Sequence, residues 1–430
     1  MEQDFTHLVT KLVFQLAAIL IAAKLAGELC ERYIKIPPVL GELTAGIAIG
    51  PFALGGIAIF GMDPLFGLGH SEGHSGAVPV SIELFSVSQI AAVVLLFAAG
   101  LETDLKQFLR YSGPATLVAI GGVAFPFAFG LGITLLLKPA GLDGDALIYA
   151  GLFIGAVMTA TSVGITARVL SDQQKLDSPE GVTILAAAVV DDVLGILILT
   201  VVIGVATPGE EISASQIAVI AVKAIGFWLA LMFGGILISN YISRSLNAFR
   251  VSGAALALAL SLAFLSAGLA ESFGLAMIIG AYTIGLALSG TPLARRIEEQ
   301  VMSVYHALVP IFFVVMGMMV DVSAMAGVLM FGSVLTILAI LSKVIGCGLP
   351  ALITGFNGIG AWRVGIGMLP RGEVALIIAG IGLSRGIIGP DIFGVVIMMT
   401  ILTTLMAPLI LVPAFKNGAS GRRRDRTIST

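Results

Sequence analysis

AAAVVDDVLGILIL, residues 186 to 199, places two adjacent acids, Asp191 and Asp192, in an otherwise aliphatic run. The surrounding apolar stretch, 180 to 206, is long enough to cross the hydrocarbon core of a bilayer, which takes about 20 helical residues. An acid at that depth costs on the order of 3 kcal/mol. Two adjacent acids therefore predict an ion or proton site, and the alternative is a buried structural pair bridged to a neighbouring cation.

The composition places nearly the whole chain in a membrane. Of its 430 residues, 58% are hydrophobic and 11% are charged, and the mean hydropathy is +1.06. Soluble proteins carry about 25% charged residues. The N-terminus has Glu2 and Asp4 in place of a basic region, and the apolar stretch after it is longer than that of a signal peptide. We therefore expect a polytopic membrane protein surrounded by lipid.

The apolar stretches between charged or Pro/Gly-rich breaks predict an all-α fold of about thirteen transmembrane helices. The expected spans are 10–30, 38–57, 84–103, 113–137, 146–170, 180–206, 213–241, 252–271, 274–290, 302–321, 327–353, 359–385 and 390–414.

The charged residues between these spans alternate along the chain. The odd-numbered spans are followed by basic residues, among them Arg32, Arg110, Arg168, Arg244 and Arg295. The even-numbered spans are followed mainly by acids, among them Asp63, Asp143 and Glu210. Because basic loops stay in the cytoplasm, we expect the N-terminus outside the cell membrane and residues 415–430 as a short basic cytoplasmic tail.

Counting the spans also predicts an inverted repeat. Spans four to six and eleven to thirteen lie seven helices apart, so the two triplets cross the membrane in opposite senses, as in many secondary transporters. The middle span of each triplet is interrupted by polar residues, in MTATSVGIT (158–166) and in MLPRGEVAL (368–376). Each is expected to form a discontinuous helix.

Lys343, in LAILSKVIGCGL, is the expected counter-charge of the acid pair. A lysine this deep needs an acid partner, and we favour Asp191. The alternative is a lysine that reaches the cytoplasmic boundary from a tilted helix.

The two interruptions supply further candidate residues. The hydroxyls of Thr161 and Ser162, with carbonyls freed by the break, are oxygen ligands of the kind that hard cations prefer; alternatively, they bond to their own backbone. Pro370 breaks the second segment, while Arg371 and Glu373 bring charges into it. A structural role for both charges is favoured slightly over direct ion ligation.

Six segments together resemble the monovalent cation/proton antiporters, and within them the bacterial sodium/proton and potassium/proton exchangers. The segments are PPVLGELTAGIAIGP (37–51), LLFAAGLETDLKQ (95–107), TATSVGITARVL (159–170), AAVVDDVLGILIL (187–199), LSKVIGCGLP (341–350) and GMLPRGEVALIIA (367–379). They occur in order across nearly the whole chain.

The resemblance implies a role for each matched residue. Asp192 would be the cation and proton carboxylate, Asp191 the salt-bridge partner of Lys343, and the interruptions around Thr161 and Gly372 would cross. It also implies a homodimer in which core helices, 84–206 and 327–414, move against dimerisation helices, 8–57 and 213–321. Members with an Asp-Asp pair are generally electrogenic sodium exchangers, which favours Na+.

The sequence therefore predicts exchange of a monovalent cation, Na+ or alternatively K+ or Li+, for protons in sodium and pH homeostasis. A K+/H+ antiporter or K+ efflux system is the first alternative. A cation channel is disfavoured because it usually has a symmetric filter, and a proton-coupled symporter because the interrupted segments carry few aromatic or anion-binding side chains. We find no nucleotide, nucleic-acid or covalent-catalysis motif, and expect no enzyme activity, cofactor or metal beyond the transported cation.

Overall fold

The structure is a computed structural model that describes residues 2–58, 63–68, 79–139, 143–206, 214–321, 329–416 and 418–423. This part of the chain is almost entirely helical, and eleven of its helical segments are long and apolar enough to cross a membrane. Two shorter apolar helices, Met277–Ser289 and Val374–Leu383, accompany them. An all-α polytopic membrane protein is thereby confirmed, whereas the count of thirteen spans stays a prediction.

Every predicted span coincides with a helix or a pair of helices. In chain order these are α1 (Glu2–Leu29) continued by the π-helical η1 (Cys30–Ile34), α2 (Pro38–Ile49) followed by the short η2 (Leu54–Gly56), α3 (Ile82–Glu102), α4 (Leu105–Leu137), α5 (Gly144–Thr159) with α6 (Val163–Asp172), α7 (Pro179–Ala206), α8 (Ala214–Asn247), α9 (Ala254–Ser272), α10 (Met277–Ser289), α11 (Pro292–Met318), α12 (Leu329–Ile353), α13 (Gly358–Gly367) with α14 (Glu373–Ser384), and α15 (Pro390–Lys416).

Several predicted boundaries are wrong because helices continue beyond the apolar stretch, as α4 and α11 illustrate. The fourth span was expected from 113, but α4 begins at Leu105 because the Asp104 carboxylate caps it by accepting from the backbone N–H of Lys106 and Gln107. The tenth span was expected from 302, but α11 begins at Pro292, since proline is favoured in a first helical turn. Hydropathy detects the apolar part of a helix and misses its charged end.

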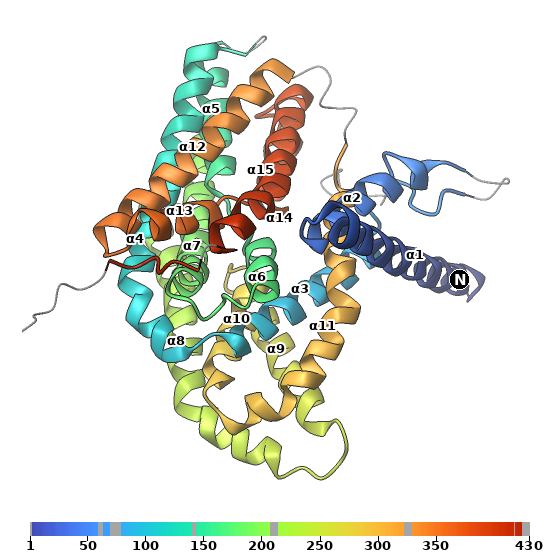
Figure 1. The fold of residues 1–430 in the computed structure, drawn as a ribbon. Helices are drawn as coiled ribbons and strands as arrows, with labels where there is room; N and C mark the ends of the chain where they lie inside the picture. The colour runs from blue at the N-terminus through green and yellow to red at the C-terminus, as the bar shows by residue number, and fades with distance from the viewer. Residues whose placement is uncertain are drawn as a thin grey trace, which may run out of the picture.

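The helices form two groups (Figure 1). In one group, α4 packs against α5, α7 and α12, and α12 packs in turn against α13 and α15. In the other, α3 packs against α10 and α11, and α11 packs against α2. The helix α6 lies between them and contacts both α3 and α15. The span that forms α3 is predicted among the core helices, but α3 packs beside α10 and α11, which are expected to form the scaffold.

Glycines set the closest helix contacts in each group. A Cβ on Gly46 in α2 would lie 2.0 Å from the Val314 carbonyl oxygen in α11, and one on Gly317 would lie 2.1 Å from the Leu43 oxygen. A Cβ on Gly121 in α4 would lie 2.0 Å from the Gly346 oxygen in α12. Small residues let the backbones of membrane helices approach closely, so these glycines set the distances between α2 and α11 and between α4 and α12.

Candidate ion-binding site

The two predicted interruptions are present as breaks between helices. The first leaves residues 160 to 162 outside any helix between α5 and α6, with Ser162 in extended conformation. The second leaves residues 368 to 372 between α13 and α14, where Pro370 has no N–H to donate and disfavours a helical residue before it. A Cβ on Gly372 would lie 2.8 Å from the Ser162 hydroxyl oxygen, so glycine there permits a close approach.

The two breaks contact each other. The backbone N–H of Ser162 donates to the carbonyl of Pro370 at 2.7 Å. The Thr166 hydroxyl donates to the Gly367 carbonyl at 2.6 Å, and the Thr161 hydroxyl approaches the Met368 carbonyl at 3.4 Å. Backbone groups left unpaired by one break thus find partners at the other, which is what makes irregular backbone tolerable at membrane depth.

Lys343 in α12 brings three elements together. Its ammonium donates to the carbonyl of Gly122 in α4 at 2.7 Å, to the carbonyl of Thr159 at 2.6 Å, and to Oδ1 of Asp191 at 3.2 Å. The lysine side chain is fully buried and that of Asp191 is 1% exposed. Lys343 is therefore buried beside Asp191, and the alternative of a lysine that reaches the membrane boundary is wrong.

Asp192 lies in a different environment from Asp191. Adjacent helical residues point about 100° apart, and Asp192 is 8% exposed whereas Asp191 is 2% exposed. The Thr161 hydroxyl also faces the Asp191 carboxylate. Ser162 Oγ is buried and has no hydrogen-bond partner within the described ranges, so a neutral oxygen at the break is available for a ligand. The Thr159 hydroxyl donates to the carbonyl of Ala156 within α5.

Arg371 supports the first break from the second. Its side chain is fully buried, and it donates to the carbonyl of Met158 at 2.8 Å and more weakly to that of Leu369 at 3.4 Å. Met158 lies in the last turn of α5, whose C-terminal end carries a partial negative charge that a cation stabilises. The Arg371 guanidinium is thus hydrogen-bonded to backbone carbonyls. Glu373 begins α14, and its side chain lies outside the part that the structure describes.

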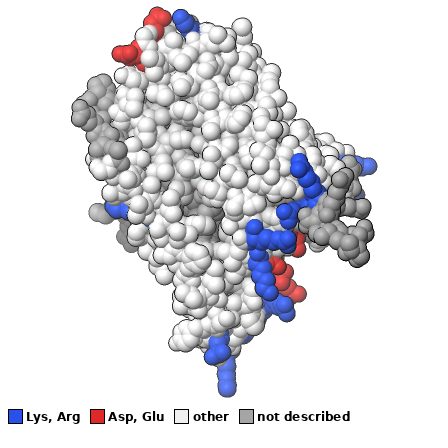
Figure 2. Space-filling model, turned by 90° about the vertical axis from the view of Figure 1, so that its left-hand side faces the viewer, with Lys and Arg blue, Asp and Glu red and all other residues white. Residues whose placement is uncertain are grey.

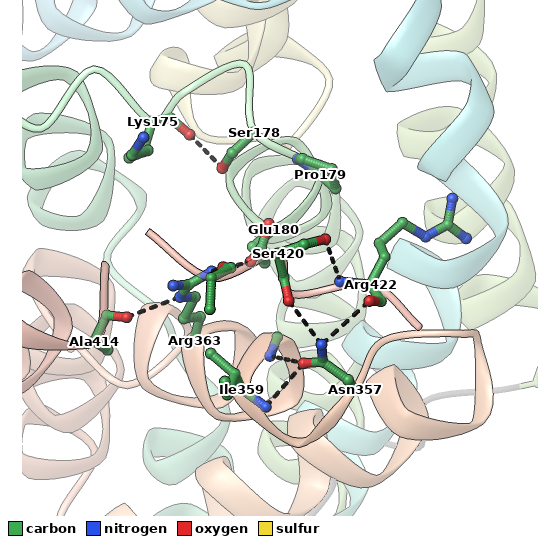
Figure 3. A network of polar contacts seen from close by, with 12 residues as sticks. Lys175, Ser178, Pro179, Glu180, Asn357, Ile359, Arg363, Ala414, Ser420 and Arg422 are labelled. Carbon is green, nitrogen blue, oxygen red and sulfur yellow. Dashed lines mark hydrogen bonds and ion pairs between the residues drawn. The ribbon is translucent and has the colours of Figure 1, made fainter. Parts of the chain in front are cut away.

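A second polar network joins the N-terminal end of α7 to the C-terminal segment 418–423 (Figure 3). Arg363 of α13 donates to Oε1 of Glu180 at 2.7 Å, to the Ala414 carbonyl at 2.9 Å and to the Ala419 carbonyl at 2.8 Å. Asn357 caps α13 with its side-chain oxygen and donates its amide to the Ser420 carbonyl at 2.7 Å.

The sequence did not reveal this network. Residues 415–430 were expected as a basic tail, but within the described range 418–423 the chain docks on α7 and α13. Charged residues next to predicted loops are usually solvated, and only the tertiary packing shows that Glu180 and Arg363 are buried.

The molecular surface agrees with a membrane protein. Figure 2 shows a broad face that is almost free of charged side chains, with most of its Lys and Arg side chains gathered at the lower right. A face of this kind suits contact with lipid hydrocarbon, where exposed charge is costly.

Comparison with known proteins identifies the family. The family described as "Sodium/hydrogen exchanger, transmembrane" matches residues 17–417. The chain belongs to the sodium/hydrogen exchanger family. Among its relatives, the "High-affinity Na(+)/H(+) antiporter NhaS3" of Synechocystis sp. is 33% identical, over 97% of this chain and 93% of its own. The "Na(+)/H(+)-K(+) antiporter GerN" of Bacillus cereus is 35% identical, over 93% and 95%.

A solved structure supports the fold of this exchanger family member. The sodium proton antiporter MjNhaP1 of Methanocaldococcus jannaschii matches with a TM-score of 0.65 over 95% of this chain and 99% of its own. The sequence identity is 20%, so this likeness concerns the fold. The family is one of transporters.

Proposed function

We propose that this exchanger moves a monovalent cation out of the cytoplasm in return for external protons, by alternating access at the Asp191–Asp192 site. One observation carries the proposal. Two adjacent acids lie buried on α7, beside the contact between two broken helices, and one of them is bonded to the buried Lys343. The relatives NhaS3 and GerN, which are named as Na(+)/H(+) and Na(+)/H(+)-K(+) antiporters, support the same exchange.

Each acid has its own role in this mechanism. Asp191 is held by Lys343, which two backbone carbonyls fix in place. Asp192 is the more exposed of the two and alternately takes up a proton or the cation. Thr161 and Ser162 supply neutral oxygens from the break. Because a carboxylate cannot hold both ligands together, and only a loaded core reorients, uptake of one ligand requires release of the other.

Arg371 and Glu373 are placed in a supporting role. Arg371 stabilises the end of α5 by donating to Met158, so it keeps the first break in shape while the ion exchanges. Glu373 is the first residue of α14, a position at which acidic residues are favoured in helices.

Na+ is the proposed cation, because the acid pair is typical of the sodium exchangers that the sequence resembles. K+ is the second candidate, since the name of the relative GerN includes K+, and Li+ is the third. We further propose that exchange is electrogenic, with more than one proton per cation.

The proposed assembly is a homodimer in the cell membrane, with the N-terminus outside and the C-terminus in the cytoplasm. The group around α4, α7 and α12 moves as the core. The scaffold contains α1, α2 and α8 to α11, and the packing of α3 on α10 and α11 supports adding α3 to it.

Cation-dependent proton flux in proteoliposomes tests the function. Na+, K+ and Li+ are compared for the wild type and for Asp192→Asn, which keeps the side-chain volume and removes the exchangeable charge. We expect exchange to fall to the background rate, because the variant has no carboxylate at position 192 to take up the proton or the cation.

Glu28→Gln is the matched control. Its carboxylate pairs with Arg32 at 3.7 Å on the exposed surface of α1, and the variant should exchange normally. Undiminished exchange by Asp192→Asn would contradict the mechanism. An imposed membrane potential should change the rate if exchange is electrogenic, and indifference to voltage would indicate one-for-one exchange.

A further inference from the structure

A buried charged cluster lies where α6 meets the scaffold helices. Glu42 of α2 is 2% exposed, Arg168 of α6 is 6% exposed and Tyr305 of α11 is 2% exposed. Arg168 lies six positions after Ser162, on the half-helix that leaves the first break. In the proposed orientation, this half-helix runs from the ion site toward the cytoplasm, so the cluster lies on that side of the site.

Direct polar contacts bind α6 to its neighbours at this point. Arg168 Nε pairs with Asp172 Oδ2 at 3.1 Å within α6, and its guanidinium carbon lies 5.0 Å from the centroid of the Tyr305 ring. The Ser171 hydroxyl donates to Glu102 Oε2 of α3 at 3.0 Å. The cluster therefore joins the proposed core to α3 and α11 of the scaffold.

Arg168 balances most of the negative charge here. Glu42 and Asp172 both act electrostatically on it, and Glu102 lies near Asp172. Lys24 and His306 also approach the cluster, but both are exposed. Within the described part of the cluster, Arg168 is the buried cation and Glu42 is the buried acid, whereas Asp172 is exposed and Glu102 is half-buried. Without Arg168, the Glu42 carboxylate would have no buried counter-charge.

Three polar atoms of the cluster lack well-formed hydrogen bonds. Glu42 Oε2, Arg168 Nη1 and Tyr305 Oη are all buried, and none has a partner of good hydrogen-bond geometry among the described residues, although the Arg168 guanidinium and the Tyr305 hydroxyl lie close to each other. Arg168 lies on α6 of the proposed core, whereas Glu42 lies on α2 and Tyr305 on α11 of the proposed scaffold. Buried polar atoms of native proteins are nearly always paired with protein or water, so an unpaired set calls for an explanation. Entry of water when α6 separates from α2 and α11 would satisfy all three.

We propose that Arg168 is a gating residue that holds α6 against α2, α3 and α11 while the ion site is closed to the cytoplasm. The proposal rests on the function and orientation proposed above. We call the contact of α6 with α2, α3 and α11 the seam. Arg168 stabilises the closed seam by compensating the charge of Asp172 on α6 and of Glu42 on α2. Opening hydrates these groups, so the closed and open arrangements remain close enough in free energy to interchange during transport.

The sign of the effect follows from the charge balance. Arg168→Gln leaves the acids of the seam without their buried cation, which favours the hydrated arrangement that is open to the cytoplasm. A ligand binds with higher apparent affinity when its competent state is more populated, and with lower affinity when that state is depleted. The apparent KM for the cation should therefore fall on the cytoplasmic side and rise on the external side.

The test measures cation-dependent exchange from each side, in inside-out and right-side-out vesicles. For Arg168→Gln we expect opposite changes of about three- to fivefold in the two KM values. Arg168→Lys keeps the charge and should stay close to the wild type. Glu42→Gln added to Arg168→Gln removes one uncompensated acid and should return both KM values toward the wild type. Size-exclusion profiles of the purified variants establish that they are folded.

Arg32→Gln is the matched control, because Arg32 also pairs with an acid four residues away on its own helix but is exposed. It should change neither KM value. A fall in the cytoplasmic KM alone would indicate relief of charge repulsion along the entry path and would overturn the gate. Equal changes on both sides, or none, would overturn it as well. Absence of exchange by the wild type would instead refute the proposed function.

Discussion

The ammonium of Lys343 lies 3.2 Å from Oδ1 of Asp191, and both side chains are shut off from solvent. Backbone carbonyls of α4 and of the end of α5 accept from the same ammonium. One side chain thus joins α12, α7, α4 and the first break, which makes it a structural centre of the site as well as an electrostatic one.

Lys343→Met should lower the stability of the folded protein. The substitution leaves the Asp191 carboxylate buried without its cation and two carbonyls without a donor, and breaking a buried ion pair costs about 3–5 kcal/mol. The double variant Asp191→Asn/Lys343→Met should recover much of the loss, because no buried charge remains unpaired. Thermal melting in detergent measures both variants. A single variant as stable as the wild type would contradict this account of the pair.

The pairing of Asp191 with Lys343 could be predicted because charges inside apolar stretches are few. An acid pair and one deep lysine leave little choice of partner, and the polar interruptions at 158–166 and 368–376 likewise stand out against aliphatic sequence. The two broken helices, α5 with α6 and α13 with α14, could be predicted for the same reason. The roles of Asp192, Thr161 and Ser162 in ion binding stay predictions.

Arg168 and Glu180 could not be recognised in the same way. Each lies close to an end of its helix, where the sequence pattern is that of a solvated cytoplasmic charge. The residues that bury them, such as Tyr305 against Arg168 and the segment 418–423 against Glu180, are distant in sequence. Hydropathy describes one helix at a time, whereas the burial of a helix end depends on what packs over it.

Competition at Asp192 predicts how the apparent affinity depends on pH. Each fall of one pH unit raises the proton concentration tenfold, so competition raises the apparent KM for the cation by up to about 10-fold. The rate at saturating cation should change less than KM. Exchange measured against cation concentration at several pH values gives both quantities. A KM that is constant over the pH range would indicate separate sites for cation and proton.

The docked C-terminal segment should stabilise the protein. A Cβ on Gly421 would lie 1.9 Å from Glu180 Oε1 and 2.8 Å from Gly360 Cα. Gly421→Val should therefore displace the segment, disturb the buried Glu180–Arg363 pair and lower the melting temperature in detergent. Gly358→Ala is the control, because nothing lies within 4 Å of a Cβ placed there. Equal melting temperatures for the two variants would show that the segment contributes no stability.

Gly46→Ala should weaken the contact between α2 and α11. The added methyl would lie 2.0 Å from the Val314 carbonyl oxygen, and backbone on both sides leaves no flexible side chain to give way. The helices must move apart, which costs apolar contact along their whole interface. We expect a loss of about 1–3 kcal/mol, typical of overpacking.

The matched control is Gly132→Ala in α4, where no atom lies within 4 Å of the new Cβ. At this position the substitution of alanine for glycine should be neutral or raise stability by up to about 1 kcal/mol, from helix propensity alone. Melting curves of the two variants separate close packing from propensity, and a Gly46→Ala protein as stable as Gly132→Ala would show that α2 and α11 are not held at backbone distance. Because Glu42 and Tyr305 lie on these two helices, Gly46→Ala should also loosen the contact of α6 with the scaffold.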